Sequence, residues 1–403
     1  MRTVAAGGLA IGDEHPPRIM GVLNVSAESP YDPSVYEDPG EAARYVDEEL
    51  IDEGADIVDI GLESANKRFE VQTAEAELDR LETAVATLES VSGDAVFSIE
   101  TRYHEVADAA LEAGFDMVND ICGFADPAMP DVCAEYDAAV VKMASPPDLE
   151  RPGALETVDG IYDALLREGL SEKTIVDPAF GGWCEGKTLA DDRETFRRLR
   201  EFRALGQPIL VSINRKNFLR NLAGRSTEQA LPVSLAATAM AVERGAHVVR
   251  THDVAATRDA ALVGKAFGRE RIRVDNGSVE ELDVTTVREA AKHLAAEPES
   301  LAAVDGDRQA IDRGQARGQR AADGELRATA EQVVSRLVAV RDLDASARAT
   351  LVARARAADL VVAEGPDRVV LGGSVDRLAS LPVEAADPAD LVTAIEHLGR
   401  LEG

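Results

Sequence analysis

Short apolar runs in this sequence end repeatedly in side chains that can hold a charged ligand. The run from Ile19 to Val25 carries Asn24, and the run that ends at Val249 is followed by Arg250 and His252. An amide oxygen can serve as a cation ligand, and an arginine fork can hold an anion. Together with several carboxylates between them, these residues predict a site for a charged heterocyclic substrate.

The elements that must position these residues alternate along the first two thirds of the chain. Apolar, strand-like runs lie at 19–25, 57–60, 96–99, 117–118, 138–143, 174–176, 209–213 and 247–249, and amphipathic segments lie between and after them. Continuous apolar strands are typical of a parallel sheet covered on both faces. Eight strands alternating with helices predict a closed (β/α)8 TIM barrel of the α/β class. The alternative is a doubly wound open sheet, although no Gly-x-Gly-x-x-Gly motif follows the first strand.

A barrel of this kind carries its active site at the carboxyl ends of its strands. Nearly every predicted strand ends in polar or charged residues: Asn24, Asp59 with Glu63, Glu100 with Thr101, Asn119 with Asp120, Met143, Asp177, Asn214 to Lys216, and Arg250 with His252 and Asp253. Random loops would rarely place amides, carboxylates and cations at so many successive strand ends. We therefore expect these residues to form one site.

The chain of 403 residues is longer than one barrel, which takes about 250 residues. The pattern predicts a barrel over residues 1–268, a helix and linker over 269–324, and a small C-terminal domain over 325–403. In the last region we expect helices at 326–341, 345–357 and 388–401, and a hairpin around Gly365, Pro366 and Asp367. A smaller α+β or helical region thus follows the barrel.

Composition limits the partners and the environment. The net charge of −31 argues against a nucleic-acid partner, because phosphates would be repelled. No apolar stretch approaches the roughly 20 residues of a membrane helix, and no signal-peptide pattern opens the chain, so we expect a cytoplasmic protein. Three cysteines are too few for a disulfide framework or a zinc cluster. Only seven of the 43 basic residues are lysine, and an acid-rich, lysine-poor surface suits a cytoplasm of high salt.

Six ordered motifs resemble those of the dihydropteroate synthase family of pterin-binding barrels. They are Met20–Val25, Glu53–Gly61 with Glu63 and Ser64, Asn119–Ile121 with Gly123, Asp177 and Pro178, Arg215 and Lys216 with Phe218 and Leu219, and Arg250 with His252–Val254. The resemblance covers roughly residues 18–268. It implies a transferase of folate biosynthesis that condenses a 6-hydroxymethyl-dihydropterin diphosphate with p-aminobenzoate or a related amine and releases diphosphate.

The resemblance also implies a role for each matched residue. Asp177 and Asn119 bind the edges of the pterin ring, and Lys216 contacts its carbonyl and ring nitrogen. Arg250 and His252 hold the diphosphate, and Asn24 is a ligand of Mg2+. Glu100, Met143 and Asn214 complete the substrate contacts, and Lys216, Asp177 and Arg250 are the catalytic residues. Members of the family dimerise through the outer helices of the barrel, so the resemblance implies a homodimer.

The sequence departs from the family pattern in the second loop, where p-aminobenzoate would be held. The family's usual Thr and Arg are here Ala65 and Asn66. Two other functions stay open, and the altered loop is the reason for the second of them. One is a pterin-dependent methyltransferase that passes a methyl group to a corrinoid protein, and the other is a non-catalytic pterin-binding paralogue. The Arg250 and His252 pair favours the synthase, because a methyltransferase has no diphosphate to bind.

Overall fold

The structure is a computed structural model. It describes residues 1–26, 32–63, 71–181, 186–269, 273–274, 279–280, 282, 284–294, 327, 330–341, 343–364, 368–384 and 387–398. These residues fall into two compact units, one within residues 1–270 and the other from residue 271 onward. Each unit is described by itself.

The first unit is built on eight parallel strands that close into a barrel. The strands are β3 (Arg18–Asn24), β4 (Ile57–Gly61), β5 (Val96–Thr101), β6 (Met117–Asp120), β7 (Ala139–Met143), β8 (Thr174–Asp177), β9 (Leu210–Val211) and β10 (Val248–Thr251). Each strand from β3 to β7 pairs with the next, and β10 pairs with both β3 and β9. A parallel bridge between Val176 and Ile209 joins β8 to the start of β9. This closure confirms the predicted barrel over the open sheet.

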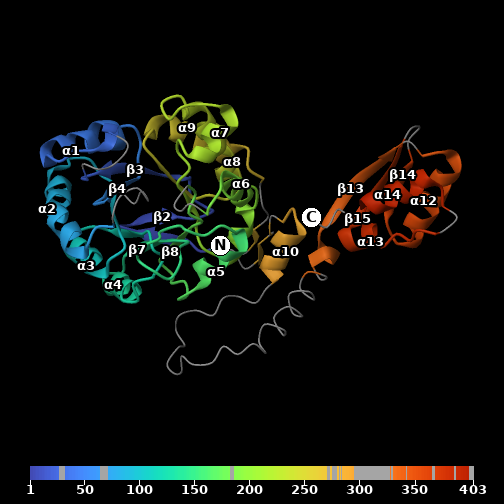
Figure 1. Cartoon of the computed structure of the whole chain (residues 1–403), viewed down its shortest axis with the longest axis horizontal. Coiled ribbons are helices and arrows are strands. Elements are labelled where there is room, and N and C mark those ends of the chain that lie inside the picture. The colour runs from blue at the N-terminus through green and yellow to red at the C-terminus, as the bar shows by residue number, and fades with distance from the viewer. Residues whose placement is uncertain are drawn as a thin grey trace, which may run out of the picture. The chain divides into compact units, whose positions relative to one another are not determined.

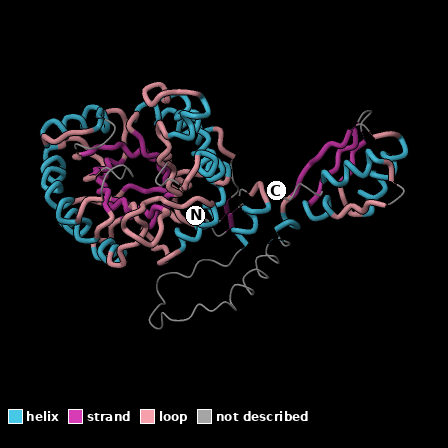
Figure 2. Tube along the Cα trace, viewed as in Figure 1, coloured by secondary structure: helices cyan, strands magenta, loops and turns pink. Residues whose placement is uncertain are grey.

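Helices surround the strands, as Figures 1 and 2 show. They are α1 (Pro39–Tyr45), which continues into the π-helical turn Val46–Ile51, α2 (Ala74–Ser90), α3 (His104–Glu112), α4 (Met129–Glu135), α5 (Val158–Leu166), α6 (Leu189–Arg197), the 3-10 turn Leu199–Leu205, α7 (Asn217–Ala223), α8 (Leu231–Glu243) and α9 (Val254–Ala266). Gly54, Gly114 and Gly245 end three of these segments with φ of 101°, 106° and 104°. A residue with a Cβ is strained at such angles, so glycine allows the chain to turn directly into the next strand.

A short hairpin lies against the amino-terminal end of the barrel. Its strands β1 (Val4–Ala6) and β2 (Leu9–Ile11) are antiparallel. Val4, Ala6 and Ile11 form one apolar cluster with residues from the amino-terminal parts of the barrel strands, among them Met20 and Ile57. This end of the barrel is therefore filled with apolar side chains, and the carboxyl end is left for a site.

The second unit is a small α+β domain. A three-stranded antiparallel sheet has the order β13 (Ser335–Arg341), β15 (Arg368–Ser374), β14 (Val361–Glu364). Helices α12 (Ala345–Ala357), α13 (Val375–Ala379) and α14 (Ala389–Leu398) supply residues to the core that the sheet shares. The unit also contains α10 (Val287–Leu294) and the short antiparallel pair β11 (Arg273–Val274) and β12 (Val279–Glu280).

One predicted element of this unit was wrong. The expected helix at 326–341 is a strand from Ser335 onward, paired along its whole length with β15. The apolar residues Val338 and Val340 alternate toward the core, which is the period of a strand. The expected helices at 345–357 and 388–401 are present as α12 and α14. Strands β14 and β15 pair as a hairpin, and the turn predicted at 365–367 lies outside the described residues.

Candidate active site

The register of the strands places several predicted site residues in two rows near the same end of the barrel. Asn24 is paired with Gly61, Gly61 with Glu100, and Glu100 with Asn119, across β3 to β6. Met143 is paired with Asp177 across β7 and β8. Because all strands are parallel, these residues lie at the same end of the barrel, opposite the apolar hairpin.

Arg250 joins the carboxylates of Asp59 and Glu100. Its Nε donates to Asp59 Oδ2 at 2.7 Å and its Nη2 to Glu100 Oε2 at 2.6 Å. The Asn119 amide nitrogen donates to the same two oxygens at 3.0 and 3.5 Å. The pKa of Glu100 is raised by burial against the opposing field of Arg250. Asn119 therefore has its nitrogen committed to the protein, and its Oδ1 is the atom that remains to accept from a ligand.

Asp59 holds Arg250 and Asn119 in place, a contact that the sequence did not predict. It is fully buried and accepts from both Arg250 and Asn119. Its position at a strand end was visible in the sequence. Its partner was not, because Arg250 reaches it only through the pairing of β10 with β3 and of β3 with β4.

The charges of Asp177 and Lys216 interact at this end of the barrel, and each shifts the pKa of the other. Burial raises the pKa of Asp177 to about 6, although the Ala179 amide donates to its Oδ1 at 2.8 Å and Lys216 and Arg250 act against the rise. Burial and Arg250 lower the pKa of Lys216 to about 8, and Asp177 acts against this fall. At neutral pH the pair is thus an ionised acceptor next to a cation.

The backbone after three of the site strands is held in a costly conformation. Phe124, Ala179 and Arg215 follow β6, β8 and β9, and their φ angles are 67°, 59° and 52°. Left-handed backbone is uncommon for residues with a side chain and persists where the surrounding contacts fix it. Ala179 follows Asp177 by two residues and Arg215 precedes Lys216, so these backbone conformations set the chain path beside both side chains.

Asn214, Arg215 and Asp253 form a structural cluster beside the site. Asn214 Nδ2 donates to Asp253 Oδ2 at 2.9 Å, and its Oδ1 accepts from the His252 amide at 3.5 Å. Arg215 donates to both oxygens of Asp253 at 2.8 Å and to backbone carbonyls at Thr227 and Glu228. The cluster joins the connections after β9 and β10.

His252 is largely buried in this region. Burial, followed by the field of Arg250, lowers its pKa to about 3. The imidazole is therefore neutral at pH 7 in the ligand-free protein, where it can offer an N–H. Of the two residues predicted to form an anion site, Arg250 alone supplies a positive charge.

The surroundings of Asn24 fit a ligand of a divalent cation. Its Nδ2 donates to Ser34 Oγ at 3.0 Å, which orients the amide so that Oδ1 is turned toward Gly61. A Cβ at position 61 would lie 3.0 Å from this oxygen, so glycine leaves room for it. A single amide oxygen fits Mg2+, which retains several waters and takes further oxygens from a substrate phosphate.

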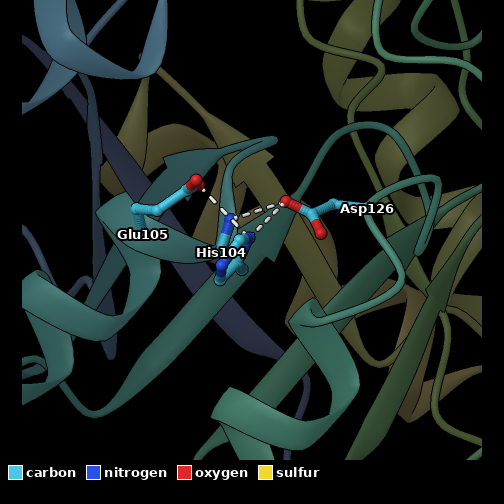
Figure 3. Close-up of side chains that lie close together, drawn as sticks. All are labelled: His104, Glu105 and Asp126. Atoms are coloured by element: carbon cyan, nitrogen blue, oxygen red, sulfur yellow. Dashed lines mark hydrogen bonds and ion pairs between the residues drawn. The ribbon is translucent and has the colours of Figure 1, made fainter.

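A second polar cluster lies in the connections after β5 and β6. Figure 3 shows the His104 ring between Glu105 and Asp126, with His104 Nδ1 at 2.8 Å from Asp126 Oδ2 and 3.2 Å from Glu105 Oε2. Asp126 also accepts from the backbone amides of His104 and Ala128, at 3.0 and 3.1 Å. The hydrogen bond to Asp126 raises the pKa of His104. These hydrogen bonds join the two connections and cap the first turn of α3.

The sequence profile of the family described as pterin binding enzyme matches residues 20–252, more than half of the chain. The chain belongs to the pterin binding enzyme family. The matched segment contains every residue to which the resemblance gives a role in substrate, catalytic or metal contacts, and Asp253 follows it directly.

Dihydropteroate synthases are similar to this pterin binding chain over the barrel. A probable bifunctional folylpolyglutamate synthase/dihydropteroate synthase of Halobacterium salinarum is 35% identical over 260 residues, which cover 62% of this chain and 31% of that protein. The dihydropteroate synthase of Streptococcus pyogenes serotype M3 is 33% identical, over 61% of this chain and 93% of its own length. The structure of the Thermus thermophilus enzyme in complex with 4-aminobenzoate has a TM-score of 0.54 at 34% identity, and the match covers 66% of this chain and 100% of that one.

The chain and its relatives differ in extent. The chain spans about a third of the length of the bifunctional relative from Halobacterium salinarum.

Ala65 and Asn66, which depart from the family's second loop, lie outside the described residues. Among the described helices, none combines the length and apolarity needed to cross a membrane.

Proposed function

We propose that the barrel is a dihydropteroate synthase-type transferase that condenses a 6-hydroxymethyl-dihydropterin diphosphate with p-aminobenzoate or a related aromatic amine. The observation that carries this proposal is the buried Asp177 carboxylate beside Lys216, at the same end of the barrel as Arg250. An amino-pyrimidine edge presents two parallel N–H donors, which a carboxylate can accept together. Asn119 Oδ1 and Lys216 then bind the other polar atoms of the ring, and Met143 and Glu100 line the pocket.

The leaving diphosphate binds next to the Arg250 guanidinium. Its guanidinium supplies charge, the neutral His252 supplies an N–H, and Asn24 Oδ1 is the protein ligand proposed for Mg2+. When bound, this ion would neutralise part of the charge that develops on the departing diphosphate. Arg250 must then share its donors between Asp59, Glu100 and the ligand, which keeps its position fixed before the substrate arrives.

The chemical step needs no covalent attachment to the protein. The lone pair of the neutral amine forms a bond to the pterin methylene carbon, the carbon–oxygen bond to diphosphate breaks, and diphosphate leaves with the electron pair. The amine nitrogen then loses a proton to solvent. Asp177, Asn119 and Lys216 hold the pterin in place, and Arg250 stabilises the charge on the leaving group, so positioning and electrostatics supply the catalysis.

Ligand binding to Arg250→Ala and His252→Ala tests this assignment. Isothermal titration should show that each variant loses more affinity for pterin diphosphate than for the corresponding pterin alcohol, because only the first ligand carries the charge. The loss should be larger for Arg250→Ala, since His252 is neutral. Equal losses for both ligands would make these residues structural, and a wild-type preference for a methylated pterin would favour the methyltransferase.

The proposed assembly is a homodimer in the cytoplasm. Apolar side chains of Met240, Leu262 and Val263 on α8 and α9 are exposed, with exposed fractions of 45%, 42% and 52%. Helices α8 and α9 pack against each other, and exposed apolar residues that gather on one face are characteristic of protein interfaces. Light scattering at high salt should give a dimer for the wild type and a monomer for Val263→Glu. A monomeric wild-type protein would contradict the assembly and leave the reaction untouched.

A further inference from the structure

One short segment after β5, Thr101–His104, contacts the connections that follow three other strands. We call it the corner segment. Arg102 Nη2 is paired with the Glu63 carboxylate after β4, and its Nη1 donates to the Leu149 carbonyl after β7 at 2.5 Å. Tyr103 Oη donates to the Gln72 carbonyl at 2.6 Å, and His104 pairs with Asp126 after β6. The corner segment thus fixes several parts of the barrel mouth together.

The connection after β4 is held at both of its described ends. The Glu63 carboxylate receives Arg102 on Oε1 and the Gln72 backbone amide on Oε2, the latter at 2.8 Å. The Gln72 carbonyl is held by Tyr103. Residue 63 is therefore bonded to residue 72, and Arg102 and Tyr103 anchor both to β5.

Arg102 is the central residue of this arrangement. Its side chain and that of Glu63 are 1% and 4% exposed, so the ion pair is buried. Removing one partner of a buried pair leaves a charge without compensation, and neighbouring segments move to solvate it. Lysine cannot replace the arginine fully, because only the planar fork reaches Glu63 and Leu149 at the same time.

The connections that Arg102 anchors are those without a polar role in the proposed pterin and diphosphate contacts. These contacts come from the ends of β3, β5, β6, β8, β9 and β10, whereas β7 adds only the apolar Met143 and β4 adds Asp59 beneath Arg250. The amine must bind at the same mouth, next to the methylene carbon. Among the described residues, Glu63 and Gln72 after β4 and Leu149 after β7 are the parts of the mouth left to shape its binding site.

We propose that Arg102 is a positioning residue for the amine, which acts through Glu63 and Leu149 and touches neither substrate. This inference rests on the proposed function and adds to it a residue that controls one substrate alone. Steady-state kinetics of the full-length protein at high salt, with pterin diphosphate and p-aminobenzoate varied separately, should show the effect. In Arg102→Gln, KM for p-aminobenzoate should rise on the order of tenfold to a hundredfold. KM for pterin diphosphate should stay near the wild-type value.

Two further variants separate positioning from general loss of stability. Arg102→Lys keeps the charge opposite Glu63 and should recover part of the p-aminobenzoate KM. Arg203→Gln is the matched control, because Arg203 forms a comparably buried pair with Asp13 near the opposite end of the barrel, at 3.1 and 2.9 Å. It should lower the melting temperature and leave both KM values unchanged. Equal rises in both KM values for Arg102→Gln, or a rise in the control, would overturn the inference.

Hydrogen exchange distinguishes failure of this inference from failure of the proposed function. In Arg102→Gln without ligands, amides in peptides 71–74 and 147–153 should exchange faster than in the wild type, and amides near Asp177 should not. Unchanged exchange at both peptides would show that Arg102 anchors nothing and would overturn the inference alone. A wild-type protein that folds and shows no turnover would overturn the proposed function, and the amine role of Arg102 with it.

Discussion

At the scale of residues, an arginine and an asparagine organise the carboxylates of the site. Arg250 and Asn119 share Asp59 and Glu100, so four side chains from four strands fix one another. The sequence predicted which residues reach the mouth, because strand ends in a parallel barrel converge. It did not predict that Asp59 is the anchor of Arg250 or that Arg102 joins neighbouring connections, since these contacts depend on side-chain direction in the folded barrel.

Asp177→Asn tests the pterin contact directly. Replacing the carboxylate removes a charge-assisted pair of hydrogen bonds, so pterin affinity should fall by about 2 to 4 kcal/mol in isothermal titration. The wild type should also bind more weakly as pH falls below about 6, because protonation of Asp177 removes the ionised acceptor. The variant should lack this pH dependence. Unchanged affinity in Asp177→Asn would remove Asp177 from the pterin site.

Glu77→Gln tests a buried carboxyl group outside the ligand contacts. Burial raises the pKa of Glu77 to about 7, while Thr101 donates to its Oε2 at 2.5 Å. A folded-state pKa above the usual 4.5 means that the stability from this group is present below pH 4.5 and lost as pH rises through about 7. One pKa unit corresponds to about 1.4 kcal/mol, so the loss is on the order of 3 kcal/mol.

Glutamine resembles the protonated form of Glu77 and carries no charge at any pH. Denaturant unfolding at pH 8 should therefore give a higher free energy of unfolding for Glu77→Gln than for the wild type. The two curves should approach each other near pH 4.5. A variant that is less stable at both pH values would show that the carboxylate is the stabilising form.

At the scale of elements, the alternation of apolar runs with amphipathic segments predicted most of the barrel. Apolar runs marked all eight strands because both faces of each strand are buried. The C-terminal region was harder, because helix-forming residues before Ser335 concealed the strand period of Leu337–Val340. No feature of the sequence predicted the π-helical turn Val46–Ile51.

Gly264→Ala tests the packing of α8 on α9. A Cβ at this position would lie 2.3 Å from the Ala239 carbonyl oxygen, so the two helices must separate. Alanine favours a helix by up to about 1 kcal/mol over glycine, whereas overpacking costs about 1 to 3 kcal/mol. The free energy of unfolding should therefore fall. Gly268→Ala is the control, because its nearest neighbours lie at 3.4 Å, and stabilisation by both substitutions would contradict the close contact.

At the scale of the whole molecule, the barrel has its own core and the C-terminal region has another. The barrel core includes Ile19, Leu23 and Val58, and the second core includes Leu351 and Leu371. No proposed pterin or diphosphate contact comes from the second unit. The sequence predicted a separate small region here, although it could not predict what that region contacts.

A shortened chain that ends at Arg269 should fold and bind pterin. The reason is that the barrel closes through β8, β9 and β10 without any residue beyond this point. Thermal unfolding at high salt should give one cooperative transition, and isothermal titration should give the affinity of the full-length protein. An insoluble product, or one without a cooperative transition, would mean that the second unit completes the barrel.

The most direct test of the account is the release of diphosphate by the purified full-length protein at high salt. With pterin diphosphate and p-aminobenzoate both present, the account predicts diphosphate and a condensation product in equal amounts, and neither when one substrate is left out. A protein that binds pterin diphosphate tightly, yet forms no product with p-aminobenzoate or any related aromatic amine, would contradict the account.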